Sequence, residues 1–362
     1  MSPLSQIRTN PAAKWIGFAL IAAALIALPF ALAQVGTAWV RITNLAILFV
    51  LLSLGLNIVV GFAGLLDLGY IAFYAVGAYV YALLASPHFN IHLPWYVILP
   101  IGAAVACLFG VMLGAPTLKL RGDYLAIVTL GFGEIVRIFL NNLSEPFNLT
   151  NGPKGITTID PIRIGEVNFA NTSNFGGLVV SGTIKYYFFL LAVLLVVIVI
   201  NLRLQDSRIG RAWEAIREDE LAARAMGINT RNMKLLAFAM GASFGGVAGG
   251  MFSAIQQFIS PESFILVESV MVLSMIVLGG MGNIWGVILG AFLLSFVPEI
   301  LRYTVEPAQR WIFGRSIIDP EVIRMLLFGL AMVVMMLFRP AGILPSLVRK
   351  RELAEEEAPK AA

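Results

Sequence analysis

The segment YYFFLLAVLLVVIVINL, residues 186–202, contains no charged residue and decides the class of fold. As an α-helix it approaches the length that crosses the hydrocarbon core of a bilayer, about 30 Å. Comparable apolar stretches recur along the 362 residues, which are 59% hydrophobic and 13% charged, with a mean hydropathy of +0.87. A typical soluble domain is about 25% charged. The composition therefore excludes a soluble globular protein and predicts an all-α, polytopic integral membrane protein.

Outward from this segment in both directions, the hydropathy predicts about ten transmembrane helices separated by short polar connections. The predicted spans are 15–34, 42–60, 65–85, 95–115, 124–140, 186–202, 235–257, 264–281, 285–301 and 325–338. Together they make a transmembrane domain of residues 15–338, between an N-terminus of 1–14 and a C-terminal tail of 339–362.

Basic residues are unevenly distributed between the two sets of connections. With the N-terminus in the cytoplasm, the inner segments carry roughly twice as many Lys and Arg as the outer ones, as the positive-inside rule requires. Both termini are therefore predicted to be cytoplasmic. The net charge of +4 reflects membrane orientation and gives no reason to expect a nucleic-acid partner.

Two polar segments flank residues 186–202. The preceding one, 141–185, is a long outer loop and a candidate docking surface for an external partner. The following one, 203–234, is cytoplasmic and contains an amphipathic pattern, because Ile209, Ala212, Trp213 and Ile216 fall on one helical face. From periodicity alone, this helix either lies on lipid or is gripped by a cytoplasmic protein.

Five sequence motifs resemble permeases of branched-chain amino acid ABC importers, and among these the M-type (LIV-I-like) subunit. They are RIGRAWEAIREDELAARAMGINTRNMKLLAF (208–238), GLNIVVGFAGLLDLGYIAFYAVGAYVYALL (55–84), YLAIVTLGFGEIVRI (124–138), VLGGMGNIWGVILGA (277–291) and FRPAGILP (338–345).

The resemblance implies a bacterial inner-membrane permease subunit with an inverted 5+5 helix repeat, without enzymatic activity of its own. It implies four kinds of contact: a second homologous permease, two cytoplasmic ATPase subunits, a periplasmic binding protein and the lipid bilayer. ATP and Mg²⁺ would be bound by the ATPases, and no cofactor is expected in this chain. The sequence agrees, since it contains no G-x-x-x-x-G-K-[ST] phosphate loop.

The resemblance also implies that the cytoplasmic loop couples the permease to the ATPases. The importer pattern is Glu-Ala-Ala, three residues, then Gly; Ala222, Ala223 and Gly227 keep this spacing, but Leu221 occupies the Glu position and Glu220 precedes it. The predicted coupling residues are Arg217, Glu220, Ala222, Ala223 and Gly227. The spacing also predicts an i, i+4 pair of Glu220 with Arg224.

Charged groups at membrane depth are costly and usually functional. Such groups mark candidates for the translocation path, together with neighbouring aromatic and hydroxyl side chains: Asp67, Tyr70, Tyr74, Thr129, Glu134 and Arg137. For Glu134 and Arg137 the alternative is a structural ion pair, since they are three residues apart on one helix. Glycine-rich breaks around 61–69 and 279–282 are predicted to unwind helices.

Small residues every fourth position predict close helix contacts. Two such series occur: Gly241, Gly245, Gly249, and Gly282, Gly286, Gly290. His88 and His92 have no third ligand nearby, and Cys107 lies among apolar residues, so we expect no metal site.

The main hypothesis is an ABC permease that moves leucine, isoleucine, valine or a related amide or urea-like compound. The alternative is an ion-coupled secondary transporter in which Asp67 and Glu134 bind the coupling ion. A membrane-embedded enzyme is excluded for want of a catalytic cluster.

Overall fold

The computed structural model describes residues 11–117, 120, 122–145, 148–175 and 178–313, and short pieces at 326, 329–330, 332–334, 337–339 and 341–345. The long helices are α2 (Pro11–Val35), α3 (Thr37–Asn57), α4 (Ile71–Leu84), α5 (Trp95–Thr117), α6 (Asp123–Asn142), α7 (Gly182–Gln205), α8 (Arg208–Glu218), α10 (Thr230–Gln256), α11 (Leu266–Gly279) and α12 (Ile284–Phe313). The short ones are η1 (Ile58–Phe62), η2 (Gly152–Lys154), α9 (Glu220–Ala225) and η3 (Pro261–Ser263).

Among the described residues, five helical stretches are long and apolar enough to cross a membrane. They are Thr37–Phe62, Trp95–Thr117, Gly182–Gln205, Thr230–Gln256 and Pro261–Gly279. Shorter apolar helices cover Ala22–Val35, Ile71–Leu84 and Ile284–Ile300. The predicted span 325–338 lies mostly outside the described residues, as do 1–10 and 346–362. The chain is thus mainly helical, with apolar helices that suit a multi-pass membrane protein.

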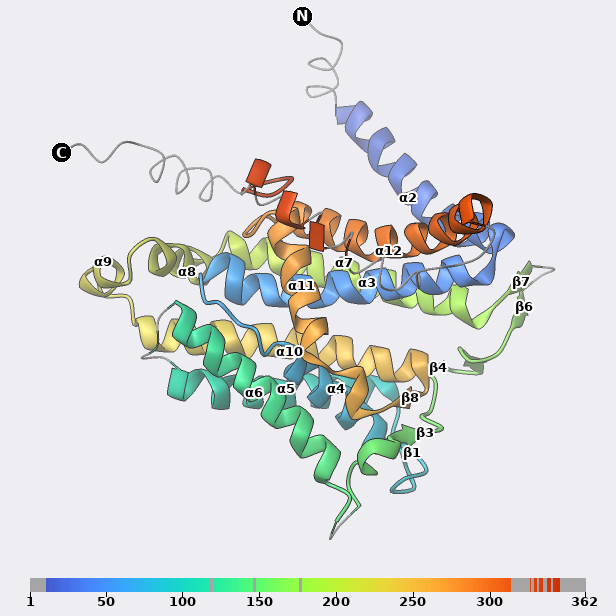
Figure 1. The fold of residues 1–362 in the computed structure, drawn as a ribbon, viewed down its shortest axis with the longest axis horizontal. Coiled ribbons are helices and arrows are strands. Elements are labelled where there is room, and N and C mark those ends of the chain that lie inside the picture. Colours follow the sequence, from blue (N-terminus) through green and yellow to red (C-terminus); the bar gives the residue numbers. More distant parts are fainter. Residues whose placement is uncertain are drawn as a thin grey trace, which may run out of the picture.

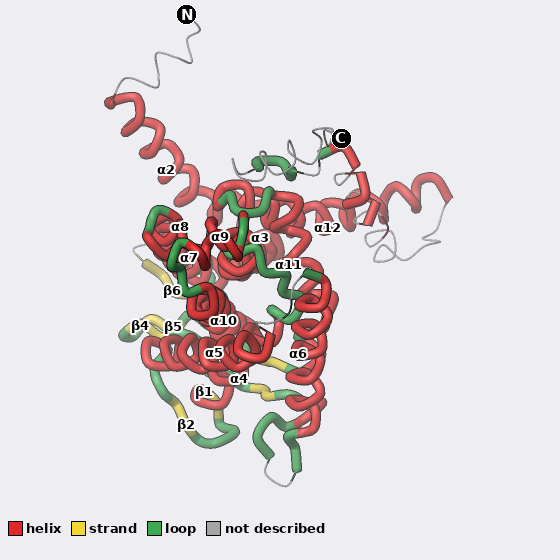
Figure 2. The backbone as a smooth tube through the Cα atoms, turned by 90° about the vertical axis from the view of Figure 1, so that its left-hand side faces the viewer, coloured by secondary structure: helices red, strands yellow, loops and turns green. Residues whose placement is uncertain are grey.

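The molecule is organised around α10. In Figure 1 the helices α3, α7, α10 and α12 run in broadly the same direction, and α10 packs against α5 and α4 on one side and α3 on another. Figure 2 looks along these helices and places α10 between α5 and α3. One end of the bundle carries α8 and α9, and the opposite end carries the short strands (Figure 1).

Glycines on α10 bring its backbone against neighbouring helices. A Cβ placed on Gly249 would overlap the carbonyl oxygen of Tyr74 in α4, and one on Gly241 would lie 2.6 Å from a Val59 methyl group. A Cβ on Gly245 would lie 3.2 Å from that of Phe73. In a membrane, where exclusion of water does not drive helices together, such close approach gains van der Waals contact.

The second glycine series does not lie on one helix. Gly286 and Gly290 are on α12 and meet α11 at Gly279 and Met275, with no room for side chains between the backbones. Gly282 lies in the turn between these helices, with φ of +80°. The prediction of helix packing is therefore wrong for Gly282, because the reversal of the chain requires a left-handed residue there.

The fold departs from a purely α class at the end of the bundle opposite α8 and α9 (Figure 1). Its strands are β1 (Ala85–Ser86), β2 (Ile91–His92), β3 (Ile156–Thr157), β4 (Arg163–Ile164), β5 (Val167–Asn168), β6 (Ser173–Phe175), β7 (Leu178–Val180) and β8 (Phe258–Ile259). They form four antiparallel pairs, β1 with β2, β3 with β8, β4 with β5 and β6 with β7. The β3–β8 pair joins the loop 141–185 to the end of α10.

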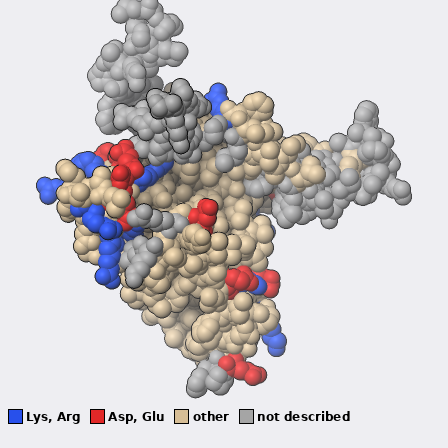
Figure 3. All heavy atoms as spheres, turned by 60° about the vertical axis from the view of Figure 1, so that its left-hand side comes forward, with Lys and Arg blue, Asp and Glu red and all other residues tan. Residues whose placement is uncertain are grey.

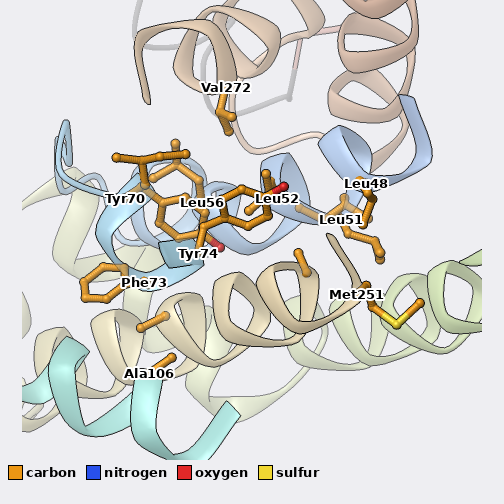
Figure 4. Packing of buried hydrophobic residues seen from close by; sticks show 14 of the residues in the cluster. Leu48, Leu51, Leu52, Leu56, Tyr70, Phe73, Tyr74, Ala106, Met251 and Val272 are labelled. Atoms are coloured by element: carbon orange, nitrogen blue, oxygen red, sulfur yellow. The ribbon is translucent and has the colours of Figure 1, made fainter. Parts of the chain in front are cut away.

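The predicted span 65–85 is a helix only from Ile71 onward. Around this start the core is aromatic: Tyr70, Phe73 and Tyr74 lie beside Leu52 and Leu56 of α3 (Figure 4). The edge of the Tyr70 ring meets Phe73 at a centroid distance of 5.9 Å, a favourable geometry for aromatic pairs.

Candidate functional site

The chain between η1 and α4 is a break in the helical path, buried inside the bundle. η1 is a π-helical turn, an element frequent at functional sites. From Ala63 to Gly69 the backbone is not helical, and Gly64 has a φ of +69°. The unwinding predicted around residues 61–69 is present.

Side chains from other elements bind the backbone of this break. Leu68 N donates to Thr129 Oγ1 on α6 at 3.0 Å, and Ile71 N donates to Ser269 Oγ on α11 at 3.1 Å. Unpaired backbone groups are costly away from water, so these hydroxyls make the break tolerable at depth. The break thereby connects α6 and α11.

Asp67 lies at the centre of the break and is fully buried, with 0% of its surface exposed. Its Oδ1 accepts a 2.8 Å hydrogen bond from Gly69 N, and Thr129 lies beside its carboxyl. Its Oδ2 has no hydrogen-bond partner among the described residues. Asp67 and Thr129, predicted separately, therefore belong to one polar cluster.

Tyr70 and Tyr74 follow the break and are also buried. The Tyr70 hydroxyl donates to Gly241 O on α10 at 2.8 Å. Tyr74 packs on Phe252 and Phe264, at ring centroid distances of 5.3 and 5.4 Å. Four of the six predicted path residues thus surround one junction of α4, α6 and α10.

Glu134 and Arg137 lie apart from that junction, half-exposed on α6. Arg137 Nε donates to Glu134 Oε1 at 3.0 Å, and Arg137 Nη1 lies 3.8 Å from Glu262 Oε1 on η3. The two residues are paired with each other, which agrees with the structural alternative, and Arg137 has a second acidic neighbour that the sequence did not reveal.

The amphipathic helix predicted in the cytoplasmic segment is α8. Ser207 caps it, accepting from Ile209 N and Gly210 N at 3.1 Å each. Trp213 is completely buried, and its Nε1 donates to Met233 O at 2.7 Å. This indole anchors α8 to the start of α10.

α9 follows immediately, capped by the side chain of Asp219. Glu220 forms the predicted pair with Arg224, at 3.4 Å, and a shorter one with Lys234 Nζ, at 2.7 Å. Lys234 is buried at the base of α10. Glu220 therefore fastens α9 to α10.

The outward face of α9 is apolar. Leu221 is 63% exposed and Met226 85% exposed, and Ala222 lies between them, whereas Ala223 is buried. Gly227 ends the segment with a φ of +87°. Figure 3 shows acidic and basic side chains gathered over the end that carries α8 and α9, so this apolar face is surrounded by charge.

Arg217 connects α8 to the buried break. Its Nη1 donates to the carbonyl oxygen of Gly61 in η1. A Cβ on Gly64 would lie 2.8 Å from Arg217 Cγ, so the arginine stem rests directly on the glycine. Among the predicted coupling residues, Arg217 thus contacts η1 and the break directly.

Beside this contact lies a pocket of about 390 Å³. It is enclosed by η1, the end of α7, α8, the α11–α12 turn and the chain near 345. Its lining residues are Gly61, Phe62, Gln205, Gly210, Glu214, Arg217, Gly282, Asn283, Trp285 and Pro345.

Sequence reasoning missed several polar side chains that hold these parts together. Asn57 Oδ1 accepts from Gly282 N at 3.0 Å and so joins both predicted breaks. Ser269 and Lys234 were also missed. An isolated asparagine within an apolar run, as at position 57, is a usable signal, because a buried amide needs a partner.

Both histidines lie near the short strands β1 and β2. His88 Nε2 is 2.9 Å from Asn148 O, and His92 Nδ1 is 2.5 Å from Asp160 Oδ2. No group of three or more His, Cys, Asp or Glu side chains that could hold a metal occurs in the described parts of the chain.

Comparison with known proteins identifies the family. The family described as "Branched-chain amino acid transport system / permease component" matches residues 38–336. The permease protein LivM of the Escherichia coli high-affinity branched-chain amino acid transport system is 46% identical over 88% of this chain and 72% of its own length. BraD of Pseudomonas aeruginosa is 28% identical over 82% of this chain and 91% of its own.

The permease protein LivH of Escherichia coli is more distant, at 23% identity over 70% of this chain and 81% of its own. No solved structure matches the chain. The family match and the LivM identity together cover most of the described helices, so this chain belongs to the permease family of branched-chain amino acid transport systems.

Proposed function

We propose that this chain is the M-type permease subunit of an ATP-binding-cassette importer for leucine, isoleucine and valine. The family membership and the greater similarity to LivM than to LivH support the assignment. The observation that carries the mechanism is the contact of Arg217 with Gly61 and Gly64, which links the cytoplasmic helices to the buried break.

The complex would contain a second, homologous permease, two cytoplasmic ATPases that bind ATP and Mg²⁺, and a periplasmic binding protein. Curated relatives of this chain include both LivM and LivH, which supports two different permeases in one system. The chain itself would catalyse no reaction and hold no cofactor.

In the membrane, we place ten spans, related as an inverted 5+5 repeat, in the bacterial inner membrane with both termini in the cytoplasm. The described apolar helices and the separation of α8–α9 from the strand end support this orientation (Figure 1). The loop 141–185 then faces the periplasm, where it would receive the binding protein.

Coupling begins at α9. Its exposed apolar face, Leu221, Ala222 and Met226, would seat in a groove of the ATPase, while Glu220 and Lys234 keep α9 attached to α10. Movement of the ATPase would shift α8, and Arg217 would transmit that shift to Gly61. Because the break has few helical hydrogen bonds of its own, it can change shape at smaller cost than a continuous helix.

The substrate path would pass the junction of α4, α6 and α10 next to the break. Tyr74, Phe252 and Phe264 offer an apolar surface to a branched side chain, and Asp67 offers a carboxylate to an ammonium group after the junction opens. Glu134 and Arg137 would stabilise α6 rather than line the path. Other small amides or urea-like compounds are the alternative substrates.

The decisive experiment is leucine uptake by proteoliposomes that contain both permeases and the ATPases, with binding protein added outside. Leu221→Asp should abolish ATP-driven uptake, because a charge enters an apolar contact. Arg231→Asp, at an exposed position on α10, is the matched control and should transport normally. Normal uptake by Leu221→Asp would contradict the coupling assignment.

The buried Asp67, whose Oδ2 has no hydrogen-bond partner within the described residues, is a feature that favours the ion-coupled alternative. Accumulation of leucine by the lone chain under a proton or sodium gradient, without ATP, would support that alternative. We expect no accumulation.

A further inference from the structure

The pocket beside Arg217 is lined both by α8, one of the two coupling helices, and by the helical bundle. One wall is α8, which contributes Gly210, Glu214 and Arg217 at i, i+4 and i+7, a single helical face. Other lining residues come from the α11–α12 turn and the first turn of α12, Asn283 and Trp285. A molecule bound here would contact α8 and the helical bundle at the same time.

The size and the charges of the pocket select a class of ligand. Its volume, about 390 Å³, falls within the range of about 300–1,000 Å³ typical of small-molecule sites. Glu214 offers a carboxylate and Arg217 a guanidinium, three residues apart on one helix. A guanidinium has five N–H donors, so it can pair with a carboxylate while it donates to a backbone carbonyl.

Apolar surface lies next to these charges. Trp285, which is 58% exposed, lines the pocket together with Phe62 and Pro345. An acid, a base and an apolar wall together suit a dipolar molecule with a hydrocarbon side chain. A free apolar amino acid has those three parts, with its ammonium matched to Glu214 and its carboxylate to Arg217.

We propose that this pocket binds a free apolar amino acid on the cytoplasmic side and thereby slows further import. A ligand that contacts both α8 and the α11–α12 turn holds α8 in one position, so movement of the ATPase is not transmitted to Gly61. The cytoplasmic location and the choice of leucine as probe rest on the proposed function.

The first test is binding of L-leucine to the full-length chain in lipid nanodiscs, followed by tryptophan fluorescence. Two analogues remove one charge each: 4-methylpentanoate lacks the ammonium, and 3-methylbutylamine lacks the carboxylate. Each should bind at least about tenfold more weakly than leucine. Equal affinity for all three compounds would overturn the zwitterion assignment.

Variants locate the binding. Glu214→Gln should weaken leucine binding about tenfold but leave 4-methylpentanoate binding unchanged, which also proves that the variant is folded. Glu218→Gln, the same substitution on α8 outside the pocket lining, should bind as the unmodified chain does. Trp285→Phe should remove the fluorescence change. Unaltered leucine binding in Glu214→Gln would overturn the proposal.

Transport provides the functional test. In vesicles that contain the whole complex, leucine preloaded on the cytoplasmic side should lower the initial uptake rate severalfold. Glu214→Gln should keep its full rate with preloaded vesicles and equal the unmodified complex in empty ones. Binding in the pocket without any ATP-driven uptake would contradict the proposed function alone, whereas uptake that preloading never slows would contradict the regulatory site alone.

Discussion

The two segments outside the helical bundle are attached to it in opposite ways. The loop 141–185 is bonded at many points: β3 pairs with β8, Ile162 N donates to the Tyr186 hydroxyl on α7, and Lys185 Nζ donates to Asn168 O, Asn171 O and Ser173 Oγ. The segment 206–229 is attached mainly through two side chains, Trp213 and Glu220, and touches the chain near the break through Arg217. Because of this difference in attachment, we call the loop 141–185 the platform and the segment 206–229 the lever.

Removal of the contact between Arg217 and Gly61 should have the largest effect on leucine uptake. Arg217→Leu should lower ATP-driven leucine uptake at least about tenfold, since a charge-assisted hydrogen bond to Gly61 is lost while the helix remains. ATP hydrolysis by the complex should continue. Arg211→Leu is the control, because Arg211 donates within its own segment, to Asp206 O. Equal uptake by the two variants would show that Arg217 transmits nothing.

Loosening the platform should have a smaller effect and a different one. Lys185 is only 6% exposed, and Lys185→Met would leave its three oxygen acceptors without the ammonium, at a cost of about 1–3 kcal/mol. Limited proteolysis of the loop and thermal unfolding in detergent measure this. The exposed Lys154→Met should be neutral. Protease resistance equal to that of the unmodified chain would contradict a bonded platform.

The ion pair on α6 should matter less again. Because Glu262 is a second acid near Arg137, Glu134→Gln should lower the thermal stability by only about 0.5–1 kcal/mol. Adding Arg137→Gln should restore both stability and uptake. A double variant that is stable yet inactive would instead place Glu134 on the substrate path, and uptake measured beside the melting temperature separates the two outcomes.

The smallest effect is expected at the exposed pair of α9. Arg224→Gln should lower the free energy of unfolding by less than about 0.5 kcal/mol and leave leucine uptake unchanged, because solvent screens the Arg224–Glu220 pair. Lys234→Gln removes the buried partner of the Glu220 carboxylate. It should lower the free energy of unfolding by more than Arg224→Gln does. If the two variants behaved alike, Glu220 would not anchor α9.

Sequence patterns predicted the apolar helices, the unwinding near Gly61, the helix α8 and the Glu220–Arg224 pair, because each depends on residues close together in the chain. The missed features depend on contacts between distant segments. Gly282 resembled a helix-packing residue by its spacing, but a chain reversal occupies it. The strands of the outer loop have two or three residues each, too few for an alternating pattern.

The site shows the same division. Asp67 and Thr129 were each singled out, yet nothing in the sequence placed the hydroxyl of one beside the carboxyl of the other. Arg217 was predicted as a coupling residue from its position in the loop, but its bond to Gly61 joins residues 156 positions apart. The pocket at Glu214 combines five separate segments, and no local motif describes it.

The glycine contacts of α10 carry a consequence for evolution. A Cβ on Gly77 would overlap Gly246 O, and one on Gly246 would lie 2.7 Å from Gly102 O on α5, so a side chain on either glycine collides with backbone atoms that no substitution can remove. Such a pair cannot drift by compensating changes. Gly241, by contrast, faces the Val59 side chain, so an alanine at 241 is tolerable once 59 becomes smaller. An alignment of homologues should therefore show positions 77 and 246 invariant and positions 241 and 59 changing together.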